Sequence, residues 1–255
     1  MTLSYLNLTL GLLLLAVPGY LIYTYDHLSL PKVALSVVRM MVQMAAMGAC
    51  LWLLYRYDSV WFNLLWLLVL VVAAAFLLVS RSRLRSSVLF LPASLSMFVS
   101  VLAVSAFVLF AVLRPESPMS ARWFVPVTGV LMAHVLTTNI HAIRTYFDSL
   151  RQDSQPYYTL LGNGASRPAA LAPYIAKALK SLTAPAMTSL SVMGLFVLPM
   201  LLSGLLLGGL HPVEAVAVFV LLMLACLAAS MLTLVLTVWL ADRHAFNRQG
   251  RLTID

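Results

Sequence analysis

The polar side chains with the clearest chemical potential lie within one apolar stretch, residues 124–147. His134 and His141 are seven residues apart, so they share one face of a helix, and Thr137 and Thr138 lie between them. Two imidazoles and two hydroxyls on one stripe could bind a metal ion or relay a proton. Hydrogen bonding between helices explains the same residues without a ligand. The spacing does not match a dedicated zinc site, so His134 and His141 are candidate metal ligands only in this looser sense.

A second group of polar and sulfur-bearing side chains lies in an earlier apolar stretch. Arg39 and Gln43 are four residues apart and share a helix face, and Met44 and Met47 belong to a neighbouring methionine stripe. One interpretation is a translocation pathway in which thioether sulfurs act as soft metal ligands. The other is that Arg39 extends to the lipid headgroups and the methionines fill gaps in the packing.

A third candidate is the stretch 194–209, which carries a proline, a serine and several glycines among apolar residues. Pro199 removes a backbone hydrogen bond and bends a membrane helix. Ser203 and Gly204, with Gly208 four residues on, allow another helix to approach closely. This stretch therefore predicts tight packing, a kinked helix that acts as a gate, or both.

Motifs of hydrolases and of nucleotide-binding proteins are missing from the sequence, which has no HExxH, no GxSxG and no P-loop. Asp58, Glu116 and Glu214 lie outside the apolar stretches and far apart. Cys50 and Cys226 lie inside apolar stretches and form neither a CxxC site nor a disulfide framework. We therefore expect the chain not to be an enzyme and to bind no cofactor of its own.

The elements that position these residues are predicted to be membrane-spanning helices. Hydrophobic residues make up 62% of the 255 residues and charged residues only 9%, against roughly 25% in a soluble domain. Because this leaves too little polar surface for a water-facing fold, we expect an all-α, polytopic protein in the lipid bilayer, with one transmembrane domain over residues 1–255. About seven stretches are long enough to span the membrane: 6–24, 33–54, 60–80, 88–113, 124–147, 186–209 and 213–241.

The distribution of basic residues predicts the direction of these spans. With the N-terminus outside, only Arg56, Arg114 and Arg122 of the 16 lysines and arginines fall on the outer side. The remainder lie on the cytoplasmic side, together with the C-terminus, as the positive-inside rule requires. This bias explains the net charge of +8 without a nucleic-acid partner.

The segment 148–185 is too polar to span the membrane, and in this orientation it lies in the cytoplasm. Within it, Ala169–Leu182 is amphipathic, with Tyr174, Lys177 and Lys180 on the polar side, which predicts a helix on the inner leaflet. The segment is either a plain connection or a docking site for a cytoplasmic partner. The apolar side of the helix consists of Ala170, Ile175, Leu179 and Leu182.

In their order and spacing these motifs resemble one family, the FetB-like permeases of iron-export ABC transporters, which includes plant aluminium-tolerance proteins. Arg39, Gln43 and Gly48 match its RxxxQxxxxG pattern. Met200 departs from the family, which has glycine there, and His134 falls where asparagine is common. The family's GLxxLPGxMxG…AGxxPxxA stretch is matched by Gly194-Leu195, Leu198-Pro199, Ser203-Gly204, Gly209, Pro212-Val213 and Ala215.

The resemblance implies a permease subunit, homodimeric and multi-pass in the bacterial inner (plasma) membrane, that exports iron or another transition metal. ATP would be bound and hydrolysed by a separate cytoplasmic ABC ATPase. Two alternatives stay open: a permease for an organic solute such as a nucleotide sugar, and a membrane scaffold without transport. The implied pathway or gate consists of Arg39, Gln43, Met44, Met47, His134, Pro199, Ser203 and Gly204. The implied ATPase-coupling residues are Leu161, Gly162, Asn163, Gly164, Ala165 and Ser166.

Overall fold

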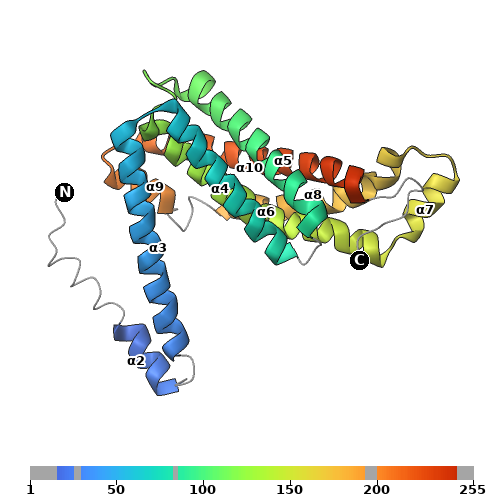
Figure 1. The fold of residues 1–255 in the computed structure, drawn as a ribbon, viewed down its shortest axis with the longest axis horizontal. Helices are drawn as coiled ribbons and strands as arrows, with labels where there is room; N and C mark the ends of the chain where they lie inside the picture. The colour runs from blue at the N-terminus through green and yellow to red at the C-terminus, as the bar shows by residue number, and fades with distance from the viewer. Residues whose placement is uncertain (1–15, 26–29, 83–85, 193–199, 246–255) are drawn as a thin grey trace. The chain divides into compact units, whose positions relative to one another are not determined.

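The computed structural model describes residues 16–25, 30–82, 86–192 and 200–245, and every regular element among them is a helix. They fall into two compact units, Met1–Tyr57 and Asp58–Asp255, and each unit is described by itself. The first unit contains α2 (Ala16–Tyr25) and α3 (Leu30–Tyr57). The second contains α4 (Val60–Ser82), α5 (Ser86–Ala106), the π-helix η2 (Phe107–Leu113), α6 (Ala121–Gln152), α7 (Gln155–Gly162), α8 (Arg167–Val192), α9 (Met200–Leu207) and α10 (Pro212–Ala245) (Figure 1).

Within the described part of the chain, five helices are long and apolar enough to cross a membrane: residues 31–57, 60–82, 89–113, 121–152 and 212–242. They correspond to five of the seven predicted spans and support a multi-pass membrane protein, in which every regular element of the described part is a helix. The other two predicted spans overlap residues outside the described ranges. The span 6–24 includes residues 6–15, and the span 186–209 includes residues 193–199, all of which lie outside the described ranges.

The predicted helix boundary at Pro185 is wrong. The sequence predicts one helix that ends near Leu182 and a separate span after the proline, whereas α8 continues from Arg167 to Val192. Proline inside a helix deprives the carbonyl four residues earlier, here that of Ser181, of its usual partner. Packing on α6 and α10 outweighs this loss, because Ala178 and Leu182 on the preceding turns are 0% and 2% exposed.

The first half of α8 has the two faces that the sequence predicts, with one exception. Lys177 and Lys180 are exposed, and Leu182 is buried. Tyr174, predicted on the polar side, is only 6% exposed, and its hydroxyl donates a hydrogen bond to the carbonyl of Asp153 (2.6 Å). A tyrosine ring packs like an apolar group once its hydroxyl finds a partner, so residue type alone misassigned its face.

Helices α6 and α10 run in the same direction. The Thr138 hydroxyl donates to Ser230 Oγ (3.1 Å), and farther along both helices the Tyr146 hydroxyl donates to the Asp242 carboxylate (2.9 and 3.0 Å). Between these helices the chain returns along the second unit. Helix α8 packs on α6, and Leu202 of α9 packs against Ala215 and Phe219 of α10.

Buried polar side chains join α5, α6 and α10 in what we call the hydroxyl seam: Ser100, Thr138, Asn139, Ser230 and Thr233. Ser100 and Thr233 share a hydrogen bond between their hydroxyls, and Asn139 Nδ2 donates to the carbonyl of Ser230 (3.2 Å). All members except Thr138 are 0% exposed. Hydrogen bonds of this kind hold helices together where apolar packing gains little over lipid.

The start of α6 is tied to the start of α4 by two side chains. Asp58 Oδ1 accepts a hydrogen bond from the Ala121 N–H (2.6 Å), and Asn63 Nδ2 donates to the Met119 carbonyl (2.8 Å). A carboxylate at this position satisfies one of the N–H groups that a helix leaves unpaired at its N-terminus and favours the helix dipole. Both helices therefore begin at the same end of the second unit.

Candidate functional site

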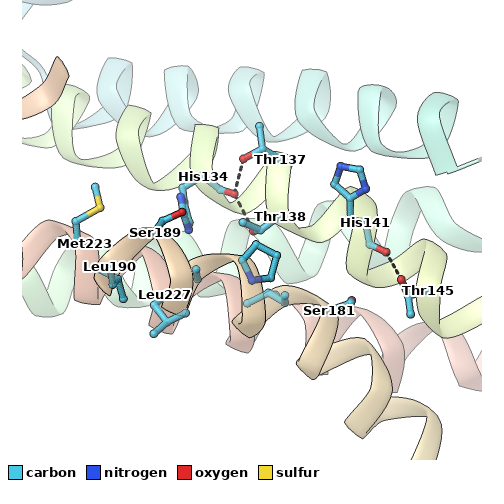
Figure 2. Close-up of a pocket in the computed structure, with 13 residues that line it drawn as sticks. His134, Thr137, Thr138, His141, Thr145, Ser181, Ser189, Leu190, Met223 and Leu227 are labelled. Atoms are coloured by element: carbon cyan, nitrogen blue, oxygen red, sulfur yellow. Dashed lines mark hydrogen bonds between the residues drawn. The ribbon is translucent and has the colours of Figure 1, made fainter. Parts of the chain in front are cut away.

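A pocket with a volume of about 770 Å³ opens between α6, α8 and α10, wholly within the second unit (Figure 2). Its polar lining comes mainly from one stripe of α6, and α8 and α10 complete it with hydroxyls, apolar side chains and one methionine. The lining residues are His134, Thr137, Thr138, His141 and Thr145 on α6, Ser181, Leu182, Pro185, Ala186, Ser189 and Leu190 on α8, and Met223 and Leu227 on α10.

Three hydroxyl groups of the pocket, those of Thr137, Thr145 and Ser181, donate to their own helices, whereas that of Thr138 also donates to Ser230 of α10. Thr137 Oγ1 donates to the carbonyls of Ala133 and His134 (both 3.0 Å), and Thr145 Oγ1 donates to the His141 carbonyl (2.9 Å) (Figure 2). On α8, the hydroxyl of Ser181 donates to its own helix in the same way. A hydroxyl whose proton is engaged in this way still has free lone pairs. The pocket therefore offers oxygen acceptors to a hydrogen-bond donor or to a cation.

The two histidines of the stripe have different surroundings. His134 is half-buried and lies beside Ser189 of α8, whereas His141 is exposed and its ring is turned away from that of His134 (Figure 2). Seven residues correspond to about 10 Å along a helix. Among the residues that the structure describes, no three His, Cys, Asp or Glu side chains come together as a metal site. Metal binding by His134 and His141 stays a prediction, and it would need donors from elsewhere.

Four other predicted pathway residues belong to the first unit. Arg39, Gln43, Met44 and Met47 lie on α3, and all four are exposed within that unit. Arg39 and Gln43 are one helical turn apart, as their spacing predicts. Their role in a pathway stays a prediction, because each unit is described by itself.

The residues predicted to form a gate lie at or near α9. Pro199 is outside the described residues, and Ser203 and Gly204 lie in α9 but do not line the pocket. Apart from its chain neighbours and the backbone of its own helix, no described atom lies within 4 Å of the position that a Cβ on Gly204 would occupy. The close helix approach predicted at Gly204 is therefore not made by the described part of the chain.

The predicted coupling residues 161–166 form the turn between α7 and α8. The Ala165 N–H donates to the Leu160 carbonyl (2.9 Å) and the Gly164 N–H to the Leu161 carbonyl (3.0 Å), and Gly164 has a φ of +83°. This is the Schellman arrangement, in which glycine readily adopts the left-handed conformation that ends the helix. A glycine therefore ends this helix, and Gly164 itself is exposed.

Several pocket residues were not among the sequence-based candidates, namely Thr145, Ser181, Ser189 and Met223. Thr145 continues the α6 stripe, since it follows His141 by four residues. Ser181 and Ser189 are eight residues apart and so lie on one face of a helix. That spacing indicates a shared face only if one helix continues through Pro185, whereas the sequence predicts a boundary there.

Comparison with known proteins extends over nearly the whole chain. The model of the family described as "Uncharacterised protein family (UPF0014)" matches residues 5–246. A UPF0014 membrane protein of Synechocystis sp. is 26% identical over 216 residues, which cover 85% of this chain and 83% of the relative. The "Probable iron export permease protein FetB" of Escherichia coli is 26% identical over 248 residues, which cover 95% of this chain and 92% of the relative.

A plant protein is also similar. The protein ALUMINUM SENSITIVE 3 of Arabidopsis thaliana is 24% identical over 154 residues, which cover 60% of this chain and 56% of that protein. No solved structure matches the chain. The predicted resemblance to FetB-like permeases is confirmed by these relatives, and the match over residues 5–246 shows that the chain belongs to the UPF0014 family of membrane proteins.

Proposed function

We propose that this chain is the membrane-spanning permease subunit of an ABC transporter that exports iron or another transition metal. The observation that carries the proposal is the pocket between α6, α8 and α10, where hydroxyls and His134 face a space inside a bundle of apolar helices. Polar groups in a membrane are costly and typically mark the path of a solute. A relative that shares almost the full length is named as an iron export permease, which supports the choice of cargo.

The proposed topology has seven crossings, with the N-terminus outside and the C-terminus in the cytoplasm. Because α6 and α10 run in the same direction, the chain between them has to return across the bilayer. In our proposal the predicted span 186–209 makes this return as the sixth crossing. The turn 161–166 then faces the cytoplasm, in agreement with the bias of basic residues.

The proposed partners follow from this orientation. A separate cytoplasmic ABC ATPase would bind at the turn 161–166 and hydrolyse ATP, so the permease needs no nucleotide site or cofactor of its own. Two permease chains and two ATPase chains would form the transporter in a bacterial inner membrane. His134 and the hydroxyl acceptors of Thr137 and Thr145 would contact the cargo.

A second candidate cargo is an organic solute such as a nucleotide sugar, and the charge of the pocket favours it. No lining residue is acidic, and Asp148, which follows the stripe on α6, is paired with Arg144 (3.5 Å). A bare multivalent cation loses its hydration at high cost unless anionic ligands replace it. Hydroxyl-rich solutes need only the hydrogen bonds that this pocket offers.

Transport in inverted membrane vesicles tests the proposal. The chain is co-expressed with a candidate cytoplasmic ABC ATPase, and iron(II) accumulation is measured with and without ATP. We expect accumulation to require ATP, both proteins and an intact P-loop lysine in the ATPase. The proposal fails if no ATPase co-purifies with the chain and accumulation is the same without ATP. ATP-dependent accumulation of a nucleotide sugar, with no accumulation of iron, would favour the second candidate.

A further inference from the structure

The pocket between α6, α8 and α10 is larger and longer than the coordination sphere of a metal ion. Its volume of about 770 Å³ lies within the range of about 300–1,000 Å³ that is typical of pockets for small organic molecules. On α6 its polar side chains extend from His134 to Thr145, which is about 16 Å along the helix axis. The ligand atoms of one cation lie only about 2.0–2.6 Å from it. An occupant that contacts the whole polar wall therefore has to be an extended molecule.

The charges around the pocket also do not suit a bare cation. Among the described residues that line it, none is acidic, lysine or arginine, and the titratable side chains are those of His134 and His141. Asp148 follows Thr145 by three residues on α6, but it is paired with Arg144 (3.5 Å). A multivalent cation without anionic ligands to replace its water would lose much of its hydration energy here. A cargo whose charge is cancelled before it enters the pocket avoids this cost.

The hydrogen bonds of the pocket determine what the occupant has to donate. The hydroxyl protons of Thr137, Thr145 and Ser181 are engaged by carbonyls of their own helices. These hydroxyls keep free lone pairs, so they accept hydrogen bonds from an occupant and do not donate to it. Water bound to a metal ion is a strong donor, because the cation polarises its O–H bonds. Hydroxyl groups of an organic ligand donate in the same way.

The walls that α8 and α10 contribute are mainly apolar. Leu182 and Leu190 of α8 and Met223 and Leu227 of α10 line the pocket (Figure 2). A hydrated ion gains nothing from such a surface, whereas the carbon atoms of an organic molecule are removed from water by it. The pocket therefore suits a molecule that has both polar and apolar surface.

We infer that the pocket binds the metal as a complex with a small hydroxycarboxylate and not as the free ion. Carboxylate oxygens of the organic ligand coordinate the metal in place of acidic side chains, so most of the charge is cancelled within the complex. Metal-bound water and the ligand's hydroxyls donate to Thr137, Thr145 and Ser181, and its carbon skeleton contacts the walls of α8 and α10. The presence of a metal in the cargo rests on the proposed function.

Double-label transport in inverted vesicles tests the inference. Vesicles that contain the chain and its ATPase receive ATP with radiolabelled iron(II) and labelled citrate, a hydroxycarboxylate, together or singly. We expect both labels to accumulate in a fixed ratio. Iron given alone in a non-chelating buffer should accumulate at least about tenfold less, because the free ion loses its hydration without replacement. Iron that accumulates equally without citrate, or that leaves the citrate label outside, overturns the inference while the proposed function stands. If iron accumulates under neither condition, the proposed function fails.

Binding to the purified full chain in lipid nanodiscs is a second measurement, and it needs neither ATP nor a partner. Equilibrium dialysis under nitrogen measures bound citrate with and without iron(II), and bound iron(II) with and without citrate. We expect the complex to bind at least about tenfold more tightly than either component, since each component alone brings an uncompensated charge into the pocket. Equal affinity of the complex and of either component overturns the inference.

A pair of variants locates this binding in the pocket. Ser189→Phe fills the space beside His134 (Figure 2), and we expect it to abolish the tighter binding of the complex. Thr188→Phe is the matched control, because Thr188 is also exposed and does not belong to the described lining. Both variants should retain the helical circular dichroism of the wild-type chain. Equal binding by the two variants overturns the assignment of the complex to this pocket.

Discussion

Helix α6 carries polar side chains into two different surroundings, the hydroxyl seam and the pocket. In the seam, Asn139 donates across the helix interface to the Ser230 carbonyl (3.2 Å), and Thr138 donates to the Ser230 hydroxyl (3.1 Å). In the pocket, Thr137 and Thr145 donate only to carbonyls of α6 itself. Both groups are polar and lie in one membrane helix, and they meet at Thr138, which belongs to the seam and also lines the pocket.

This difference indicates how a polar residue in a membrane helix should be interpreted. A side chain that bonds to another helix contributes to assembly, and its loss is felt as instability. A side chain that bonds only to its own backbone adds little to assembly and keeps lone pairs free for a ligand. Polarity alone therefore does not identify a transport pathway, whereas the location of the hydrogen-bond partner does.

The largest expected effect comes from filling the pocket. Ser189→Phe places a bulky ring beside His134, and we expect transport to fall by at least about tenfold because the space for cargo is lost. The unfolding free energy should stay within about 0.5 kcal/mol, since Ser189 is exposed. Thr188→Phe is the control, because Thr188 is also exposed but does not line the pocket. Equal transport by the two variants would remove the pocket from the pathway.

An intermediate effect is expected from the seam. Asn139→Ala removes a buried side chain and its bond to the Ser230 carbonyl, and we expect the unfolding free energy to fall by about 1–2 kcal/mol. Thr137→Ala, two residues away on the same helix, should change it by less than about 0.5 kcal/mol. Unfolding in bicelles measures both. Similar losses would mean that the seam and the pocket do not differ in their contribution to assembly.

The smallest effect is expected for a single hydroxyl of the seam. Ser230→Ala leaves the backbone carbonyl that Asn139 uses and removes only the partner of Thr138, so we expect a loss of about 0.6 kcal/mol. Transport should stay near the wild-type rate, because Ser230 is 0% exposed and does not line the pocket. The same unfolding and vesicle measurements apply. A large transport defect with normal stability would show that the seam takes part in the pathway.

Hydrophobicity predicted the elements of this fold better than it predicted their contacts. Five spans follow from apolar stretches alone, because a membrane helix needs about 20 apolar residues. The continuation of α8 through Pro185 and the burial of Tyr174 could not be predicted, since each depends on packing against other helices. The bond between Tyr146 and Asp242 joins residues 96 apart in the sequence, and local spacing carries no information about it.

The sequence predicted only part of the candidate site, because local spacing does not show which helices pack together. The stripe from His134 to His141 was visible because one helix carries it. The serines of α8 and Met223 of α10 were not, because their convergence depends on how three helices pack. Likewise, the neighbouring sequence does not distinguish Thr137, whose side chain faces the pocket, from Asn139, whose side chain lies in the seam.

The tie between Asp58 and Ala121 has a consequence for biosynthesis. The partners are 63 residues apart, and together with Asn63 and Met119 they close a loop that contains α4, α5 and η2. This part of the second unit can assemble while the ribosome is still making the remainder, as N-terminal parts of chains generally do. Helix α10 emerges last, and until it arrives the seam residues of α5 and α6 lack their partners. A nascent chain released before α10 would thus keep only the bonds that Ser100, Thr138 and Asn139 make within their own helices, and α5 and α6 would lack the hydrogen bonds that join them to α10.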